Sequence, residues 1–112
     1  MKRVYIAGKM RGLPQYNFPA FRKYTAEWRA AGWEVVSPAE MDENIGFTEN
    51  NPEPTKEFLK DAIKRDVLAI LECDALALIP GWEGSKGVRV EIALADFLDI
   101  SIYCAKKREP FV

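Results

Sequence analysis

Three side chains in this sequence could carry acid–base or nucleophilic chemistry. Glu91 is the only charged residue from Val90 to Leu94, early in a segment that we interpret as a buried helix. Asp66 interrupts the apolar stripe of another predicted helix, and Tyr5 lies in a short β-prone run. A carboxylate can attack a sugar carbon and form a covalent glycosyl-enzyme intermediate. If the three side chains converge on one ligand, the reaction class that they indicate is glycosyl cleavage.

Each of these residues also has a simpler structural interpretation. Burying an unpaired carboxylate is costly, so Glu91 could instead lie on an exposed edge or form an ion pair with Arg89 or Arg65. The helix that carries Asp66 could roll enough to expose its carboxylate to water. Tyr5 could pack in the core, as aromatic residues in strands usually do. The residues alone leave these alternatives open.

A second group of residues could bind an anion. The segment 84–87, with the sequence GSKG, precedes a predicted helix, where free backbone N–H groups, the Ser85 hydroxyl and the helix dipole favour a phosphate. Lys9 and Arg11 follow the first predicted strand and could add positive charge. The spacing matches neither the P-loop nor the dinucleotide fingerprint. The alternative, glycines that only permit a turn beside two solvated cations, has about equal weight.

The composition excludes several classes of chemistry. The chain has no histidine, which removes Ser/His/Asp and Cys/His catalysis and histidine metal ligation, so we expect no metal and no cofactor. The net charge is −1 without a basic block, so we expect no binding to duplex nucleic acid. Cys73 and Cys104 have no zinc or redox spacing and are predicted to be reduced core thiols of a cytoplasmic protein. No apolar stretch approaches the length of a membrane span.

The elements that must position these residues alternate between strand and helix. We predict strands over residues 2–8, 33–37, 75–79 and 100–104, with a fifth strand if the tail contributes. We predict helices from Asn17 to Gly32, from Thr55 to Ile70 and over 88–98, the last apolar on most of its circumference and therefore buried. Residues 38–54 hold five acidic and no basic residues and are predicted to be a loop, either the wall of a site or a solvated insertion.

This alternation predicts one α/β domain over residues 1–112 with a flavodoxin/Rossmann-like three-layer fold. The parallel sheet would have four, possibly five, strands in the order 2-1-3-4. In that order a ligand lies beyond the carboxyl ends of the first and third strands. The loops over 8–17 and 80–87 should therefore meet at the site.

Several segments resemble a known superfamily. They span residues 5–12 (YIAGKMRG), 16–21 (YNFPAF) and 31–40 (AGWEVVSPAE), continue at Arg65-Asp66, and extend from Cys73-Asp74-Ala75 to Glu91-Ile92-Ala93. The pattern is similar to the nucleoside 2-deoxyribosyltransferase superfamily. Within it, the pattern most resembles the DUF4406 domains of phages and bacteria and the 2′-deoxynucleoside 5′-monophosphate N-glycosidases.

The resemblance implies roles for individual residues. Glu91 would be the nucleophile that attacks the anomeric carbon, Asp66 a helper carboxylate near the sugar and base, and Tyr5 the residue that orients the nucleophile or the sugar. The predicted phosphate- and substrate-binding residues are Gly8, Lys9, Arg11, Ser85, Gly87, Arg89 and Trp82.

Two positions depart from the pattern of the monophosphate hydrolases. Lys9 replaces a common phosphate-binding serine, although a lysine can still bind phosphate as a point charge. Arg89 replaces a common glycine and could narrow the pocket, extend the anion site or pair with Glu91. The sites of this superfamily are also often completed by a neighbouring subunit, which implies a homodimer or a higher homo-oligomer.

The expected function is hydrolysis of the N-glycosidic bond of a nucleoside 5′-monophosphate, with a deoxyribonucleotide favoured. If a second base accepted the sugar, the same chemistry would make the protein a deoxyribosyltransferase. A different class of function is a module that binds a nucleotide or an ADP-ribose derivative without turning it over. The weakest alternative is a purely structural oligomer, suggested by three tryptophans that could be partly exposed.

Overall fold

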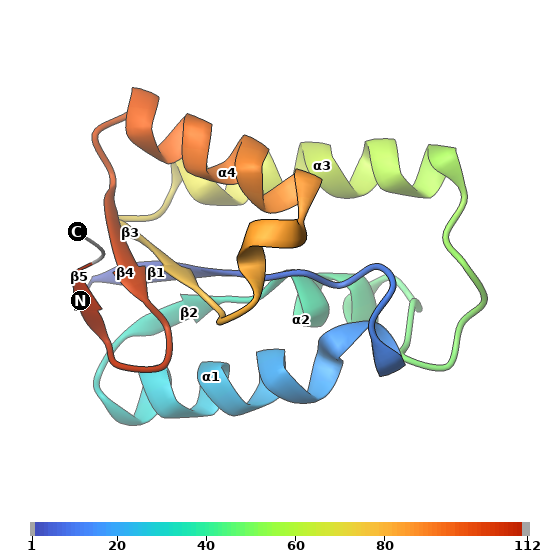
Figure 1. The fold of residues 1–112 in the computed structure, drawn as a ribbon, viewed down its shortest axis with the longest axis horizontal. Helices are drawn as coiled ribbons and strands as arrows, with labels where there is room; N and C mark the ends of the chain where they lie inside the picture. The colour runs from blue at the N-terminus through green and yellow to red at the C-terminus, as the bar shows by residue number, and fades with distance from the viewer. Residues whose placement is uncertain (1, 111–112) are drawn as a thin grey trace.

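The computed structural model describes residues 2–110, which form a five-stranded sheet in the order β2-β1-β3-β4-β5 (Figure 1). The strands are β1 (Arg3–Ala7), β2 (Glu34–Val36), β3 (Ala75–Leu78), β4 (Ser101–Cys104) and β5 (Glu109–Pro110). The first four are parallel, and β5 pairs antiparallel with β4. The predicted strand order and the contribution of the tail are both confirmed.

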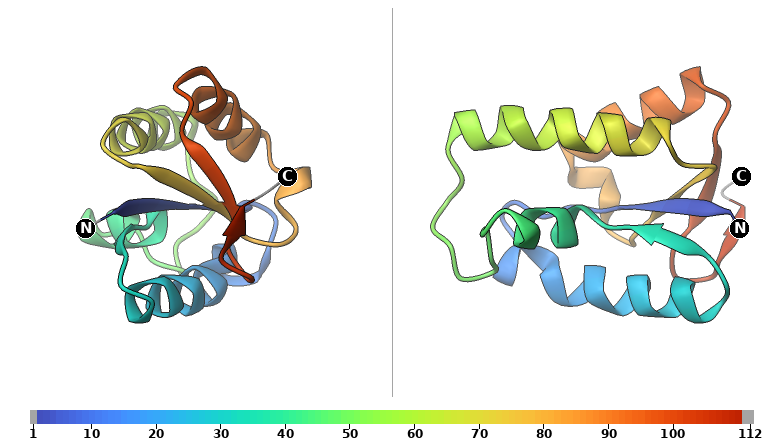
Figure 2. Two further views of the ribbon diagram at one scale, coloured as in Figure 1. Left: turned by 90° about the vertical axis from the view of Figure 1, so that its left-hand side faces the viewer. Right: turned by 180° about the vertical axis from the view of Figure 1, so that it is seen from behind.

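Helices cover both faces of the sheet, as the two further views show (Figure 2). They are α1 (Phe18–Ala30), α2 (Pro38–Asn44), α3 (Lys56–Leu71) and α4 (Lys86–Phe97), with short 3₁₀ turns η1 (Pro14–Asn17) and η2 (Trp82–Gly84). The helices α3 and α4 lie side by side on one face, and α1 packs on the other with α2 beside it. The molecule is therefore a three-layer Rossmann-like α/β fold.

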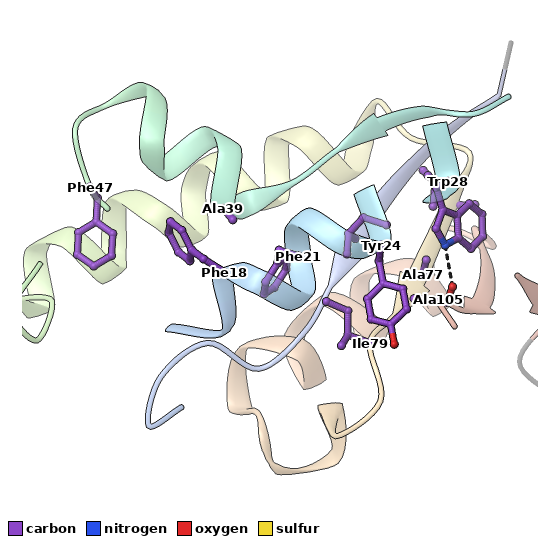
Figure 3. Close-up of a cluster of buried hydrophobic side chains, with 12 residues drawn as sticks. Phe18, Phe21, Tyr24, Trp28, Ala39, Phe47, Ala77, Ile79 and Ala105 are labelled. Atoms are coloured by element: carbon purple, nitrogen blue, oxygen red, sulfur yellow. Dashed lines mark hydrogen bonds between the residues drawn. The ribbon is translucent and has the colours of Figure 1, made fainter. Parts of the chain in front are cut away.

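The face covered by α1 holds an aromatic core (Figure 3). Phe18, Phe21 and Trp28 are fully buried, and their separations of three and seven residues place them on one side of the helix. The indole N–H of Trp28 donates to the carbonyl oxygen of Ala105 at 2.9 Å. The Trp28 ring also meets the ring of Tyr103 edge-on, with centroids 5.8 Å apart. This side of the core is mostly apolar and its indole donor is paired, whereas the buried hydroxyl of Thr25 on α1 has no hydrogen-bond partner among the described residues.

The strand β1 divides its side chains between the two faces. Val4 and Ile6 belong to the aromatic core, whereas Tyr5 and Ala7 pack with residues of α3 and α4. Alternate side chains of a strand point to opposite faces, so the register of β1 fixes the direction of Tyr5. The Tyr5 ring is fully buried, and it lies on the α3 and α4 side of the sheet.

Two sequence predictions about helices are wrong. Residues 38–54 are not all loop, because α2 forms at their start, where Ser37 precedes Pro38 at the first helical position. The helix predicted over 88–98 is not buried around most of its circumference. Only Val88, Glu91 and Ala95 are buried in α4, whereas Phe97 is 82% exposed.

The two cysteines are free thiols, with Cys73 buried and Cys104 half-buried. No helix within residues 2–110 is long and apolar enough to cross a membrane.

Candidate active site

A cleft of about 540 Å³ opens beyond the carboxyl ends of β1 and β3. Its walls come from the loop after β1, the segment 38–54, residues 58–66 of α3 and the first turns of α4. This is the position that the sheet order predicts for a ligand. The acidic segment therefore forms one wall of the cleft, the first of the two interpretations open to it from the sequence.

Tyr5, Asp66 and Glu91 meet at the base of this cleft. The Tyr5 hydroxyl donates a hydrogen bond to Oε2 of Glu91 at 2.5 Å, and all three side chains line the cleft. Glu91 is only 6% exposed. The structure thus brings two carboxyl groups and a phenol together, which is the condition on which the hypothesis of glycosyl cleavage depends.

The ion-pair alternative for Glu91 is wrong. Arg89 instead donates to the carbonyl oxygen of Glu83 at 3.0 Å. Arg65 instead pairs with Asp42, with 3.3 Å between Nη2 and Oδ1. Neither guanidinium neutralises Glu91, so the partner of this buried carboxylate is a neutral phenol.

The surroundings of Glu91 favour its protonated form. Burial raises the pKa of Glu91 from 4.5 to about 8, the hydrogen bond from Tyr5 opposes this shift, and the charge of Asp66 adds to it. Burial also holds the pKa of Tyr5 well above 10, and both carboxylates add to that effect. Tyr5 therefore remains a neutral donor across the physiological pH range.

Asp66 is a second carboxyl with a perturbed pKa. Burial raises its pKa from 3.8 to about 7, and the negative charge of Asp42 adds to the shift. The hydrogen bond from Tyr5 and the charge of Arg65 oppose it. Asp66 and Glu91 therefore form a coupled pair that takes up and releases protons near neutral pH.

This pair has the properties of an acid and a nucleophile in one site. Between pH of about 7 and about 8 the pair holds a single proton on average. The state with Glu91 ionised and Asp66 protonated would supply a nucleophile and a general acid together. Because the pKa of Glu91 is the higher of the two, the single proton lies mainly on Glu91, and the state with Glu91 ionised is the less populated one. Tyr5 raises the population of that state by donating a hydrogen bond to Glu91, which opposes the rise in its pKa.

The anion-binding half of the cleft lies at the start of α4. The Ser85 hydroxyl accepts a hydrogen bond from the backbone N–H of Val88 at 3.2 Å and so caps the helix. The backbone N–H groups of Lys86 and Gly87 have no acceptor within the helix, and both Ser85 and Gly87 line the cleft. A Cβ added at Gly87 would meet only Ser85 Oγ, at 3.9 Å, so packing within the protein does not require this glycine.

Lys9 and Gly84 show that the two predicted loops do meet. The Lys9 side chain lies so close to Gly84 that a Cβ there would be 3.5 Å from Lys9 Nζ. The side-chain amide of Asn17 donates to the Lys9 carbonyl oxygen at 2.9 Å and holds this loop in place. Lys9 thereby presents an ammonium group beside the start of α4.

Gly8 and Arg11 border the cleft, and each has a contact within the protein that involves no ligand. A Cβ added at Gly8 would lie 2.8 Å from Cδ1 of Ile79, so this glycine is needed for β1 to end against β3. Arg11 lines the outer cleft with a side chain that is 61% exposed, and its guanidinium lies 3.7 Å from Glu53. Both residues border the site, but Gly8 has a packing role that does not depend on a ligand.

Two predicted site residues do not line the cleft. Trp82 packs against the apolar core between the sheet and the helices α3 and α4. Arg89 lies on an exposed side of α4. Of the predicted set, the structure brings eight residues together around one cavity: Tyr5, Gly8, Lys9, Arg11, Asp66, Ser85, Gly87 and Glu91.

An aromatic wall and a third carboxylate of the cleft were not predicted from the sequence. Tyr16, Phe47 and Phe58 line the cleft, and Phe47 meets both other rings at centroid distances of 5.3 and 4.6 Å. Asp42 projects from α2 and is 6% exposed. The sequence Ser37-Pro38-Ala39-Glu40 follows the S-x-x-E helix-start pattern and could have revealed α2, and with it Asp42.

The loop that carries Tyr16 has a strained backbone. Gln15, Tyr16 and Asn17 have φ angles of 55°, 52° and 61°, which non-glycine residues rarely adopt in succession. The Tyr16 hydroxyl donates to the Asn51 carbonyl oxygen at 2.7 Å, which links this loop to the opposite wall. The aromatic wall is therefore held by a hydrogen bond across the cleft.

The residues described hold no group of three or more Cys, Asp or Glu side chains placed to bind a metal ion. The arrangement in the cleft is instead one of carboxyl groups, a phenol, an ammonium group and a helix N-terminus.

Comparison with known proteins finds a family and solved structures of similar fold. The family described as Domain of unknown function (DUF4406) matches residues 2–104. A solved structure titled "Solution Structure of BlsM" is 24% identical with a TM-score of 0.62, and the match covers 89% of this chain and 61% of that one. At this identity the likeness shows a shared fold, and this chain spans less than two thirds of that protein. No curated protein matches.

Proposed function

The chain belongs to the DUF4406 family, and from the chemistry of its cleft we propose that it hydrolyses the N-glycosidic bond of a nucleoside 5′-monophosphate. The products would be a free base and a sugar phosphate. The observation that carries the proposal is the buried hydrogen bond from Tyr5 to Glu91, next to Asp66 and at the start of α4. The likeness of the sequence to the nucleoside 2-deoxyribosyltransferase superfamily supports the same reaction class.

In the first step a carboxylate oxygen of Glu91 attacks C1′ of the sugar. A bond forms between this oxygen and C1′ while the bond from C1′ to the base nitrogen breaks, which leaves a covalent glycosyl ester. Asp66, in its protonated form, supplies the proton that the departing base takes up. Tyr5 keeps its own proton and orients Glu91 by donating to it.

In the second step water attacks C1′ and releases Glu91. Asp66, now ionised, accepts a proton from that water, so both carboxyl groups return to their starting states. If a second base attacked instead of water, the same intermediate would transfer the sugar. Hydrolysis and transfer therefore share every residue named, and supplying a second base to the reaction distinguishes them.

The phosphate would lie at the start of α4. Backbone N–H groups of the first turn, the positive end of the helix dipole and the Lys9 ammonium group favour a dianion there. The missing side chain at Gly87 leaves room for phosphate oxygens close to the backbone. The base would then lie against Tyr16, Phe47 and Phe58, since aromatic faces stack on nucleobases.

The test is incubation of the protein with each common ribonucleoside and deoxyribonucleoside 5′-monophosphate, followed by chromatography for free base. We expect base release from at least one of them and much slower release from the matching nucleoside without phosphate. Glu91→Gln keeps the shape of the side chain but removes the nucleophile, and should lower the rate by about 1,000-fold or more. Base release by that variant at the wild-type rate would contradict the mechanism.

The raised pKa of Glu91 favours a second candidate, a module that binds a nucleotide without cleaving it. With a pKa of about 8, Glu91 is mostly neutral at pH 7 and would act as a hydrogen-bond donor rather than a nucleophile. Calorimetry with the same nucleotides, followed by chromatography of the same mixtures, distinguishes the two functions. Binding without any released base up to pH 9 would favour the module.

A further inference from the structure

Asp42 is a buried charged residue of the cleft that has no role in the reaction proposed above. It projects from α2 and lines the same cleft as Asp66 and Glu91. A buried carboxylate loses its hydration, so its position needs a compensating interaction or a function. Among the described residues, the one hydrogen bond to its side chain comes from Arg65.

The contact between Asp42 and Arg65 is a poor structural ion pair. A single contact joins the two side chains, at 3.3 Å from Nη2 to Oδ1, and Nε of Arg65 is buried without a hydrogen-bond partner in the described chain. Burial raises the pKa of Asp42, and the hydrogen bond and charge of Arg65 do not fully oppose the rise. A bidentate pair would compensate burial better, and buried ion pairs in general add little stability. The stability of the fold therefore does not account for this pair.

The pair determines where the Arg65 guanidinium lies. Arg65 and Asp66 are consecutive in α3, so their side chains leave the helix about 100° apart. Asp42 binds the guanidinium, and the ring of Phe58 lies beside it with its centroid 5.7 Å from Cζ. Asp66 lines the cleft, whereas Arg65 does not. Asp42 therefore holds the cation next to Asp66 in sequence outside the cleft.

We infer that Asp42 is a positioning residue of the proposed reaction, which keeps Asp66 protonated by holding Arg65 away from it and by placing a second negative charge near it. The inference rests on the proposed function, because it concerns the general acid that this function assigns to Asp66. Asp42 acts through Asp66 and takes no part in making or breaking bonds.

The groups that act on Asp66 come from four elements: Tyr5 on β1, Asp42 on α2, Arg65 on α3 itself and Glu91 on α4. Burial and the charge of Asp42 raise the pKa of Asp66 to about 7, whereas the hydrogen bond from Tyr5 and the charge of Arg65 oppose the rise. The charge of Asp66 in turn raises the pKa of Glu91. The other charged side chains that line the cleft belong to the loop after β1 and the start of α4, and they are Lys9, Arg11 and Lys86. Neutralising Asp42 thus acts twice in the same direction, since it removes a negative charge and frees Arg65.

A lower pKa of Asp66 should have a specific effect on the pH profile. The reaction needs the proton on Asp66 while Glu91 is ionised, which is the less populated form of the singly protonated pair. If the pKa of Asp66 falls, the pair loses its first proton at a lower pH and the productive form becomes rarer. The acid limb of the profile then moves to lower pH while the maximum rate falls, by about tenfold for each pH unit.

The first test is the rate of base release across the pH range in wild type and Asp42→Asn, with the nucleotide that the wild type cleaves fastest. Asparagine keeps the shape of the side chain but has no charge. We expect a maximum rate lower by about tenfold or more, an acid limb at lower pH, and a smaller change in KM than in kcat. An unmoved acid limb in this variant would overturn the inference.

Glu40→Gln is the matched control for that measurement. Glu40 is a charged residue of the same helix, but it pairs with Arg29 and does not line the cleft. Its pH profile should match that of the wild type. A profile shifted as in Asp42→Asn would show that any charge lost from α2 has this effect, and would overturn the specific role of Asp42.

A double variant tests the part played by Arg65. Asp42→Asn with Arg65→Gln removes the freed cation as well as the acid, so the acid limb should move back toward its wild-type position and the rate should recover several-fold. A purely structural role would leave the acid limb in place in every variant. An acid limb that stays where Asp42→Asn puts it would contradict the displacement of Arg65.

Titration of the Asp66 side chain by carbon NMR distinguishes this inference from the proposed function. The carboxyl signals of a 12.7 kDa chain can be followed without substrate, and the same spectra show whether the variant is folded. Asp66 should titrate about one pH unit lower in Asp42→Asn than in the wild type. If the wild type releases no base but this shift occurs, the proposed function is wrong and the effect of Asp42 on Asp66 is supported. An unshifted Asp66 would overturn the inference whatever the activity.

Discussion

The two faces of the sheet bury polar groups in opposite ways. On the α1 face, the Trp28 indole N–H is paired with a neutral carbonyl oxygen inside an aromatic core. On the α3 and α4 face, Glu91 is buried against a neutral phenol and near a second carboxyl group. A paired neutral group adds stability when it is buried, whereas a buried carboxyl has a raised pKa and costs stability when ionised. Both faces therefore contribute a packed core, but only the α3 and α4 face also buries the ionisable groups Glu91 and Asp66.

The largest effect on stability should come from removing a buried ring from the aromatic core on the α1 face. Trp28→Ala removes a fully buried ring and leaves the Ala105 carbonyl oxygen without its donor, so the free energy of unfolding should fall by about 3–5 kcal/mol. Glu91→Gln, matched to it on the other face, should leave that free energy nearly unchanged or raise it. Chemical denaturation of both variants measures the difference. Equal losses would show that the two faces contribute alike.

A smaller effect, on the rate of base release, is expected when the α3 and α4 face loses one hydroxyl group but keeps its packing. Tyr5→Phe keeps the ring but removes the hydroxyl that favours ionised Glu91. Under the proposed function, base release at pH 7 should slow about 10- to 100-fold, which is about 1.4–2.7 kcal/mol in the barrier. The pH at which activity rises should also move upward, since Tyr5 lowers the pKa of Glu91. An unchanged pH profile would contradict the role of Tyr5.

The next effect is on the pH dependence of stability, which should come from the α3 and α4 face because Glu91 and Asp66 are buried there. The pKa of Glu91 is about 8 and that of Asp66 about 7 in the folded chain, against ordinary values of 4.5 and 3.8. Between these limits the folded chain binds more protons than the unfolded chain, so the free energy of unfolding falls as pH rises. The slope should be of the order of 1 kcal/mol per pH unit. Denaturation of wild type and of the double variant Glu91→Gln with Asp66→Asn should show this slope in the wild type alone.

The smallest effect should come from a surface ion pair beside the aromatic face. Arg22 lies 2.9 Å from Glu49 and 3.2 Å from Glu43, but its side chain is 47% exposed. Solvent screening weakens such contacts, so Arg22→Gln should lower the free energy of unfolding by less than about 1 kcal/mol. A loss of several kcal/mol, measured by the same denaturation, would mean that this face depends on charge as well as on packing.

The sheet and the position of Glu91 could be predicted from the sequence because both depend on short-range patterns. Apolar runs that end at glycine or proline marked the strands, and an isolated carboxylate in an apolar helix marked Glu91. The strand order then placed the cleft without further information. The roles of Asp66 and Tyr5 came from a resemblance and not from spacing.

The aromatic wall of the cleft and the helix α2 could not be predicted from short-range sequence patterns. Phe47 follows α2 in a stretch with no regular apolar period, so its position depends on tertiary packing against Phe58. The exposed apolar side of α4 was mistaken for burial, because apolar residues give the same sequence pattern whether they are exposed or buried. Arg89 was assigned to the cleft, but its place on the helix circumference directs it outward.

The left-handed turn over residues 15–17 places a strained stretch of backbone in one wall of the cleft. Each of its three residues sits in a conformation that costs roughly 1–2 kcal/mol, and glycine would relieve this cost at any one of them. If stability were the only requirement, glycine would be the better residue at these positions. The side chains at these positions therefore lower the stability of the folded chain, and in return this wall of the cleft has a fixed shape before a ligand binds.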